Sequence, residues 1–184
     1  MKAIRRLKRW CRGLGHLRGF GIQSPFAYSL VRNVFGEKAP YYKYVELDLL
    51  YPNISYNERK FGRLLFRLAN YLQAHTFYVD PVLDSFVFTF LQAGAQQSRK
   101  TEKATDAAFC VLSSGNESAL HDFLLNVKET DVLVLNDIYV DGRPSAQWSH
   151  LLAFGNVKVT FDFYSFGVVF FHSSLQRKDY LLNF

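Results

Sequence analysis

The chain of 184 residues is long enough for one domain with a buried core, and its 49% hydrophobic and 21% charged residues, with a net charge of +6, are ordinary for a globular protein. No apolar run approaches the ~20 residues of a membrane-spanning helix, and no apolar stretch follows the basic N-terminus as it would in a signal peptide. The two cysteines, Cys11 and Cys110, are too few for a disulfide framework or a metal-ligand pattern, so we expect a reducing, cytoplasmic setting.

The first 20 residues form a basic arm. Up to residue 35 the chain has eight basic residues and no acidic one, so the other 14 of its 22 basic residues are matched by 16 acidic ones. Apolar residues recur every three or four positions in KAIRRLKRWCRGLGHL, which predicts an amphipathic helix. We expect it to contact an anionic membrane surface or nucleic acid, or to pack on the protein itself or a partner subunit; a transit peptide is a further alternative. The residues expected to make these contacts are Arg5, Arg6, Lys8, Arg9, Trp10 and Arg12.

Residues 21–75 are expected to form helices that provide packing and no chemistry. Ser24 and Pro25 are typical of a helix N-cap and first helical position. The segment YYKYVELDLLY predicts a short helix that ends before a proline. Ser55 and Glu58 have the spacing of a capping box, and the strongest helical stripe of apolar residues in the chain follows them.

From residue 76 onward, predicted strands alternate with predicted helices. This alternation indicates a parallel sheet that is covered on both faces. The last two strands flank the hairpin YSFG, so we expect the last strand to be antiparallel, and we expect SRKTEKAT to be a polar loop. The predicted strands are Thr76–Val79, 107–112, 132–135, 157–163 and 168–171, and the predicted helices are 85–97, 117–127 and 144–154.

Four segments have a familiar pattern: GFGIQSPFAY (19–28), RLLFRLANY (63–71), LNDIYVDGRPSAQW (135–148) and VKVTFDFYSFGVVFF (157–171). They are distributed over most of the chain, from residue 19 to residue 171. They resemble small class I S-adenosylmethionine-dependent methyltransferases, in particular uncharacterised bacterial-type members. This resemblance implies a Rossmann-like α/β fold with S-adenosylmethionine bound at the turn that follows the first strand.

The turn after the first strand departs from the family's pattern. The family carries an acidic residue and glycines there, because glycine lets the backbone turn and approach the cofactor closely. In this chain Tyr78 stands in the place of the acid, and Asp80 and Asp84 stand in the places of the glycines, with Pro81 between them. Their side chains would project into the space that the ligand needs. We also expect Asp84 to cap the helix predicted for 85–97.

The second and third strand–helix units of the family are expected to be missing, because only the polar loop 98–105 separates the helix of 85–97 from the next strand. The family's sheet order of 3-2-1-4-5-7-6 would then shorten to 1-4-5-7-6. Thr76–Val79 would become an edge strand, and exposed strand edges attract other chains. We therefore expect the arm or a second copy of the chain to cover this edge, the latter as a homo-oligomer.

Polar residues follow the next two predicted strands. Metal-dependent relatives bind Mg²⁺ with oxygen ligands at such places, but here Asn136 and Asp137 would need Ser113 or Glu117 as the third ligand, so we expect no metal site. Asp162 is expected to face solvent, with the mouth of a former substrate site as the alternative. No catalytic residue is assigned. The candidates for a vestigial cofactor pocket are Tyr78, Asp80, Asp84, Ser113, Asn136 and Asp137.

The sequence predicts one compact domain that consists of the arm (1–20), helical elements (21–75) and a trimmed, methyltransferase-like α/β core of about five strands (76–184). We expect a degenerate protein without catalytic activity or cofactor that acts by binding or self-association. One alternative is an S-adenosylmethionine-dependent methyltransferase with an atypical cofactor site. The other is a cytoplasmic protein, peripheral to a membrane or bound to nucleic acid, that uses its basic arm.

Overall fold

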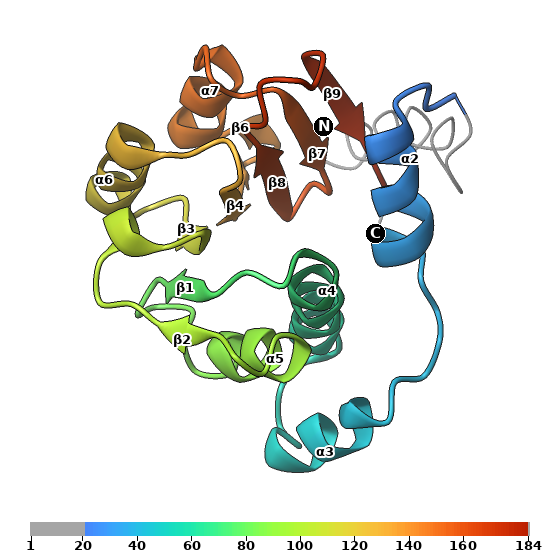
Figure 1. Cartoon of the computed structure of the whole chain (residues 1–184). Helices are drawn as coiled ribbons and strands as arrows, with labels where there is room; N and C mark the ends of the chain where they lie inside the picture. The colour runs from blue at the N-terminus through green and yellow to red at the C-terminus, as the bar shows by residue number, and fades with distance from the viewer. Residues whose placement is uncertain (1–20, 184) are drawn as a thin grey trace.

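The computed structural model describes residues 21–183 and shows an α/β arrangement around one central sheet of seven strands (Figure 1). The strands are β1 (Thr76–Val79), β2 (Arg99–Lys100), β3 (Phe109–Ser113), β4 (Val132–Asn136), β7 (Val159–Asp162), β8 (Phe166–Phe170) and β9 (Lys178–Leu181). Their order across the sheet is β2-β1-β3-β4-β8-β7-β9. All run parallel except β8, which is antiparallel to both of its neighbours.

The five predicted strands are present as β1, β3, β4, β7 and β8, and they lie beside one another in the expected order. Strand β8 is antiparallel, as the hairpin before it predicted. The prediction of about five strands is too low, because two short strands extend the sheet: β9 pairs with β7, and β2 pairs with β1. Both added strands carry charged residues, so neither shows the apolar pattern by which a strand is recognised.

Strand β2 makes β1 an interior strand of the sheet, where an edge strand was expected. Thr76 and Phe77 pair with Arg99 and Lys100, so β1 is hydrogen-bonded on both sides. The predictions that residues 98–105 form only a loop and that β1 is an edge strand are therefore wrong, and the homo-oligomer expected through that edge loses its basis. Backbone pairing needs no apolar side chain, and charged residues are typical of sheet edges.

Within the described part of the chain there are six α-helices. They are α2 (Pro25–Leu30), α3 (Lys43–Leu50), α4 (Tyr56–Leu72), α5 (Val87–Gly94), α6 (Glu117–Asn126) and α7 (Ala146–Ala153). A π-helical turn, η2 (Val31–Phe35), continues α2. Ser24 caps α2 as predicted, and the predicted capping box starts α4: the Ser55 hydroxyl accepts from the Glu58 N–H at 3.2 Å, and the Glu58 carboxylate accepts from the Ser55 N–H at 2.7 Å.

The central sheet is buried on both faces, as its apolar strands predicted. Phe109 and Val111 of β3 belong to an apolar cluster with α2, α4 and α5, whereas Cys110 and Leu112 belong to a second cluster with α6 and α7. Figure 1 shows these helices in two layers on either side of the strands. Burial raises the pKa of the Cys110 thiol well above its usual value, which makes this cysteine a core residue and a poor nucleophile.

The predicted basic arm falls on residues 1–20, outside the described part of the chain. This applies to all six of its expected contact residues, Arg5, Arg6, Lys8, Arg9, Trp10 and Arg12. Among residues 21–183, no helix combines the length and the apolar character that crossing a membrane requires.

Candidate functional site

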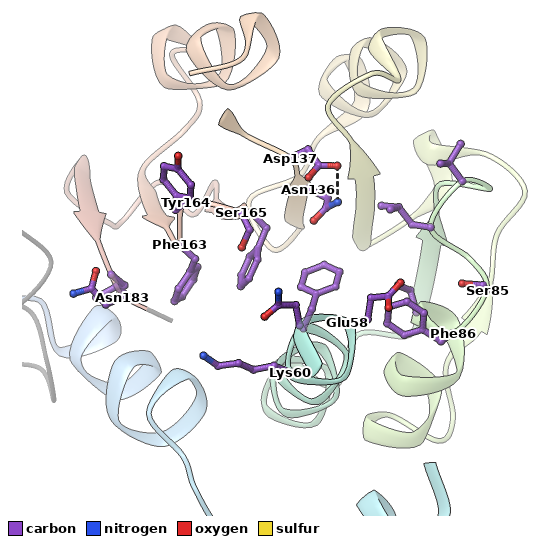
Figure 2. A pocket seen from close by; sticks show the side chains of 17 residues that line it. Glu58, Lys60, Ser85, Phe86, Asn136, Asp137, Phe163, Tyr164, Ser165 and Asn183 are labelled. Atoms are coloured by element: carbon purple, nitrogen blue, oxygen red, sulfur yellow. Dashed lines mark hydrogen bonds between the residues drawn. The ribbon is translucent and has the colours of Figure 1, made fainter. Parts of the chain in front are cut away.

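A cavity of about 680 Å³ lies at the edge of the sheet where β4 and β7 end and β8 begins (Figure 2). It is lined from five segments, near residues 57–61, 82–87, 136–137, 163–166 and 182–183, and we call it the edge cavity. The start of α4 and the turn after β1 form the parts of its wall that do not belong to the sheet. Open α/β sheets bind their ligands at this edge, outside the carboxyl ends of the parallel strands.

The lining of the edge cavity combines aromatic rings with polar and charged side chains. Phe61 of α4 lies 4.9 Å from Phe166, and the ring of Phe166 stacks on that of Phe163 at 4.8 Å. Asn136 and Asp137 supply polar groups to the same space. About half of the lining residues are polar or charged, so the edge cavity is more polar than the usual small-molecule site, which has an apolar lining with a few placed polar groups.

Asn136 and Asp137 are held at the end of β4 by a turn that the sequence favours. Asp137 has a left-handed backbone with φ of 57°, a conformation that aspartate tolerates better than most residues do. Its N–H donates to the carbonyl of Ser165 at 2.6 Å, which joins β4 to the β7–β8 hairpin. The Asn136 amide donates to the Asp137 carboxylate at 3.0 Å, as the dashed line in Figure 2 shows.

Asp162 organises the hairpin beside the cavity. The prediction that it faces solvent is wrong, because it is only 5% exposed. Its carboxylate accepts from the N–H of Tyr164 at 2.8 Å and from the hydroxyl of Tyr139 at 2.9 Å, and the two tyrosine rings stack at 5.1 Å. Tyr164 belongs to the hairpin that the sequence predicted. Tyr139 lies in a second, short hairpin of β5 (Tyr139–Val140) and β6 (Arg143–Pro144) that was not predicted, although its turn, Asp141-Gly142 with φ of 50° and 77°, is a typical hairpin signal.

Asp80 lies at the start of the turn after β1, beside the end of β3, and is only 2% exposed. One carboxylate oxygen accepts from the N–H of Ser113 at 3.1 Å and the other from the N–H of Val82 at 3.2 Å. The Asp80 N–H donates to the Val111 carbonyl at 2.8 Å, and its own carbonyl accepts from Leu83 at 2.8 Å. The side chain thus ties the ends of two neighbouring strands together, which is a structural role.

Replacing Asp80 by alanine is expected to lower the free energy of unfolding by about 1–2 kcal/mol, because the Ser113 N–H loses its acceptor in a partly buried place. Urea denaturation measures the change. Asp84→Ala is the matched control: it removes a partly exposed ion pair with Lys100 and should cost below about 1 kcal/mol. Equal costs for the two variants would contradict the structural role of Asp80.

The other residues of the predicted pocket also make internal contacts. Asp84 pairs with Lys100 of β2, and α5 begins after Phe86 without a side-chain cap, so the prediction that Asp84 caps this helix is wrong. Tyr78 packs against the cluster of α6 and α7, and burial, then the neighbouring charge of Asp80, raise its pKa. The hydroxyl of Ser113 accepts from the N–H of Gly115 at 3.4 Å.

Only Asn136 and Asp137 of the six predicted residues line the edge cavity; Tyr78, Asp80, Asp84 and Ser113 do not. Glu117, the alternative metal ligand, instead accepts from the Gln147 amide at 2.5 Å. Among residues 21–183, no group of three or more His, Cys, Asp or Glu side chains is placed to hold a metal ion. The arrangement therefore offers a recess for a ligand, with aromatic and amide contacts.

Comparison of the chain with models of protein families, with curated proteins and with solved structures found no match. The edge cavity and the turn after β1 are therefore the features of the molecule that bear on its function. Both lie in the described part of the chain.

Proposed function

We propose that the chain is a methyltransferase-like protein of Rossmann type that has lost its cofactor site and acts by binding, without catalysis. The order β1-β3-β4-β8-β7, with β8 antiparallel, supports the fold assignment, because it is the order expected for that fold without its outer strands. The edge cavity supports a binding role, since it occupies the ligand-binding edge of such sheets.

The observation that carries the proposal is the enclosed carboxylate of Asp80. A cofactor that binds at this turn needs free backbone N–H groups and space next to the backbone. Here the N–H groups of Ser113 and Val82 donate to Asp80, and the N–H of Asp80 donates to Val111. Within the turn, the N–H of Val82 thus donates to the Asp80 side chain, and the N–H groups of Asp80 and Leu83 donate to backbone carbonyls. The Asp80 side chain fills the space beside the two strand ends.

The place expected to hold the ribose supports the same view. Strand β2 consists of two basic residues, and Lys100 pairs with Asp84 from the turn after β1. The next residue, Thr101, donates its hydroxyl to the carbonyls of Phe77 at 3.3 Å and Lys103 at 3.1 Å. Internal contacts thus occupy the end of β2, where a nucleotide-binding relative would present an acidic side chain to the ribose.

Thermal unfolding with and without 1 mM S-adenosylmethionine or S-adenosylhomocysteine tests the proposal, and we expect no shift. A site with a dissociation constant of about 10 μM would add about 2.7 kcal/mol and raise the melting temperature by roughly 5–10 °C. Adenosine at the same concentration is the matched control. A shift with the two cofactor forms and none with adenosine would contradict the proposal and favour a methyltransferase with an atypical cofactor site.

A further inference from the structure

A second cavity, of about 1070 Å³, lies between α4 and the segment that connects η2 to α3. This segment runs at a distance from α4 along one side of the molecule (Figure 1). One lining side chain, Glu37, is acidic and six are basic, so we call it the basic cavity. The six basic residues are Arg32, Lys38, Arg59, Lys60, Arg63 and Arg67.

Arg67 is the most buried of these basic residues, at 9% exposure. Its Nε donates to the carbonyl of Val34 at 2.7 Å, and its Nη1 donates to the hydroxyl of Tyr44 at 3.3 Å. Both acceptors are neutral, and within residues 21–183 no carboxylate forms an ion pair with Arg67. A buried charge without a counter-charge is unfavourable, so an anion that enters the cavity would stabilise this guanidinium.

Arg59 and Arg63 are held in fixed positions by a single acidic side chain. The nearest guanidinium nitrogens of Arg59 and Arg63 lie 2.5 Å and 2.6 Å from the two carboxylate oxygens of Asp48. The Arg63 guanidinium also lies over the ring of Tyr44, 4.7 Å from its centroid. One carboxylate orders two cations and neutralises the charge of only one. Guanidinium groups that are ordered in advance lose less conformational entropy when they bind an anion.

The rest of the lining is apolar. Val31, Phe35, Phe163 and Leu182 contribute to it, and the rings of Phe35 and Phe163 meet edge to face at 4.9 Å. Phe163 and Leu182 also line the edge cavity, so the two cavities are neighbours. Burial, followed by the charge of Arg67, lowers the pKa of Lys60, which agrees with a concentration of positive charge here.

We propose that the basic cavity binds a small organic anion. Its apolar body would lie against Phe35 and Phe163, and its acidic group would lie at Arg59, Arg63 and Arg67. An inorganic ion would leave the aromatic part of the cavity unused, and a neutral apolar molecule would leave the charge of Arg67 without a partner. This inference is independent of the proposed loss of the cofactor site, because none of the three arginines lines the edge cavity.

Fluorescence titration of the full chain with 1-anilinonaphthalene-8-sulfonate, an aromatic sulfonate, tests the proposal. We expect saturable binding that 2-naphthoate displaces, because naphthoate has an apolar body and a carboxylate. The amide 2-naphthamide has almost the same shape without the charge, so it should displace at least about 10-fold less effectively. Equal displacement by naphthoate and naphthamide would overturn the proposal.

Two variants locate the binding site. The double variant Arg32→Gln/Lys38→Gln changes exposed residues of the basic cavity and should weaken binding about 5-fold. Arg67→Met should weaken it at least about 10-fold, and circular dichroism checks that it folds. If Arg67→Met does not fold, the binding of the double variant alone tests whether the anion occupies the basic cavity. Arg143→Gln, in the β5–β6 hairpin outside both cavities, is the matched control and should bind unchanged. Unchanged binding by the double variant would overturn the assignment to this cavity.

Discussion

Trp148→Ala is expected to lower the free energy of unfolding by about 3–5 kcal/mol. Trp148 is 1% exposed and packs α7 on the sheet over Gly167 of β8, where an added Cβ would meet the indole ring at 2.4 Å. The strands on either side of Gly167 are hydrogen-bonded to β8 and cannot move into the space that the indole leaves. Urea denaturation followed by circular dichroism measures the loss.

A double-mutant cycle with Gly167→Ala tests whether this contact explains the loss. On its own, Gly167→Ala should lower the free energy of unfolding by about 1–3 kcal/mol, because the added methyl group overlaps the indole ring of Trp148. In the Trp148→Ala background the same methyl group enters empty space, so its cost should fall below about 0.5 kcal/mol. If the change in the free energy of unfolding of the double variant equals the sum of those of the two single variants, Gly167 and Trp148 do not pack on each other.

Gly94→Ala is expected to lower the free energy of unfolding by about 3 kcal/mol. This loss is expected although alanine is more favourable than glycine within a helix by about 1 kcal/mol. Gly94 ends α5 where this helix crosses α4, and a Cβ there would stand 2.2 Å from the carbonyl oxygen of Phe66 and 3.1 Å from the Cβ of Ala69. A backbone carbonyl within a helix cannot rotate away as a side chain can. Separation of the two helices therefore outweighs the gain in helix propensity.

The matched control for Gly94 is Gly155→Ala, since nothing lies within 4 Å of a Cβ at Gly155. This change should alter the free energy of unfolding by less than about 0.5 kcal/mol, as is usual for surface positions. Chemical denaturation of the two variants side by side makes the comparison. If Gly94→Ala proves no more destabilising than Gly155→Ala, the close crossing of α4 and α5 is not required for stability.

The elements that the sequence predicted well are those with local causes. Ser55 and Glu58 cap α4 by contacts within one helical turn, so their spacing alone is informative. Strand β1 was predicted with its observed bounds, because TFYV is β-branched and aromatic and lies between a helix end and a turn. Apolar runs likewise located β3 and β4, which are buried on both faces.

The elements that sequence reasoning missed depend on distant partners. Arg99–Lys100 becomes strand β2 because β1 presents free backbone groups beside it, and neither residue has a side chain that favours a strand. Lys178–Leu181 joins the other edge for the same reason, next to β7. Asp84 was predicted as a helix cap from its position just before the helix, whereas Lys100, 16 residues later in the chain, binds its carboxylate.

The candidate site was predictable only in part. The prediction of Asn136 and Asp137 follows from the rule that ligands bind outside the carboxyl ends of parallel strands, and both residues line the edge cavity. The basic cavity could not be recognised, because Arg67 reads as one more polar residue on an amphipathic helix. Arg67 is buried because η2 packs on α4, and its guanidinium then donates to the carbonyl of Val34, 33 residues earlier in the sequence.

The interior position of β8 has a consequence for how the protein is made. This strand lies between β4 and β7, yet of the elements in residues 21–183 a ribosome synthesises only β9 after it. A nascent chain that has emerged as far as α7 therefore carries β4 with one unpaired, apolar edge. We expect the sheet to close late, when the β7–β8 hairpin adds to β4 as one unit. Until then the growing chain offers other chains an edge that the finished protein buries completely.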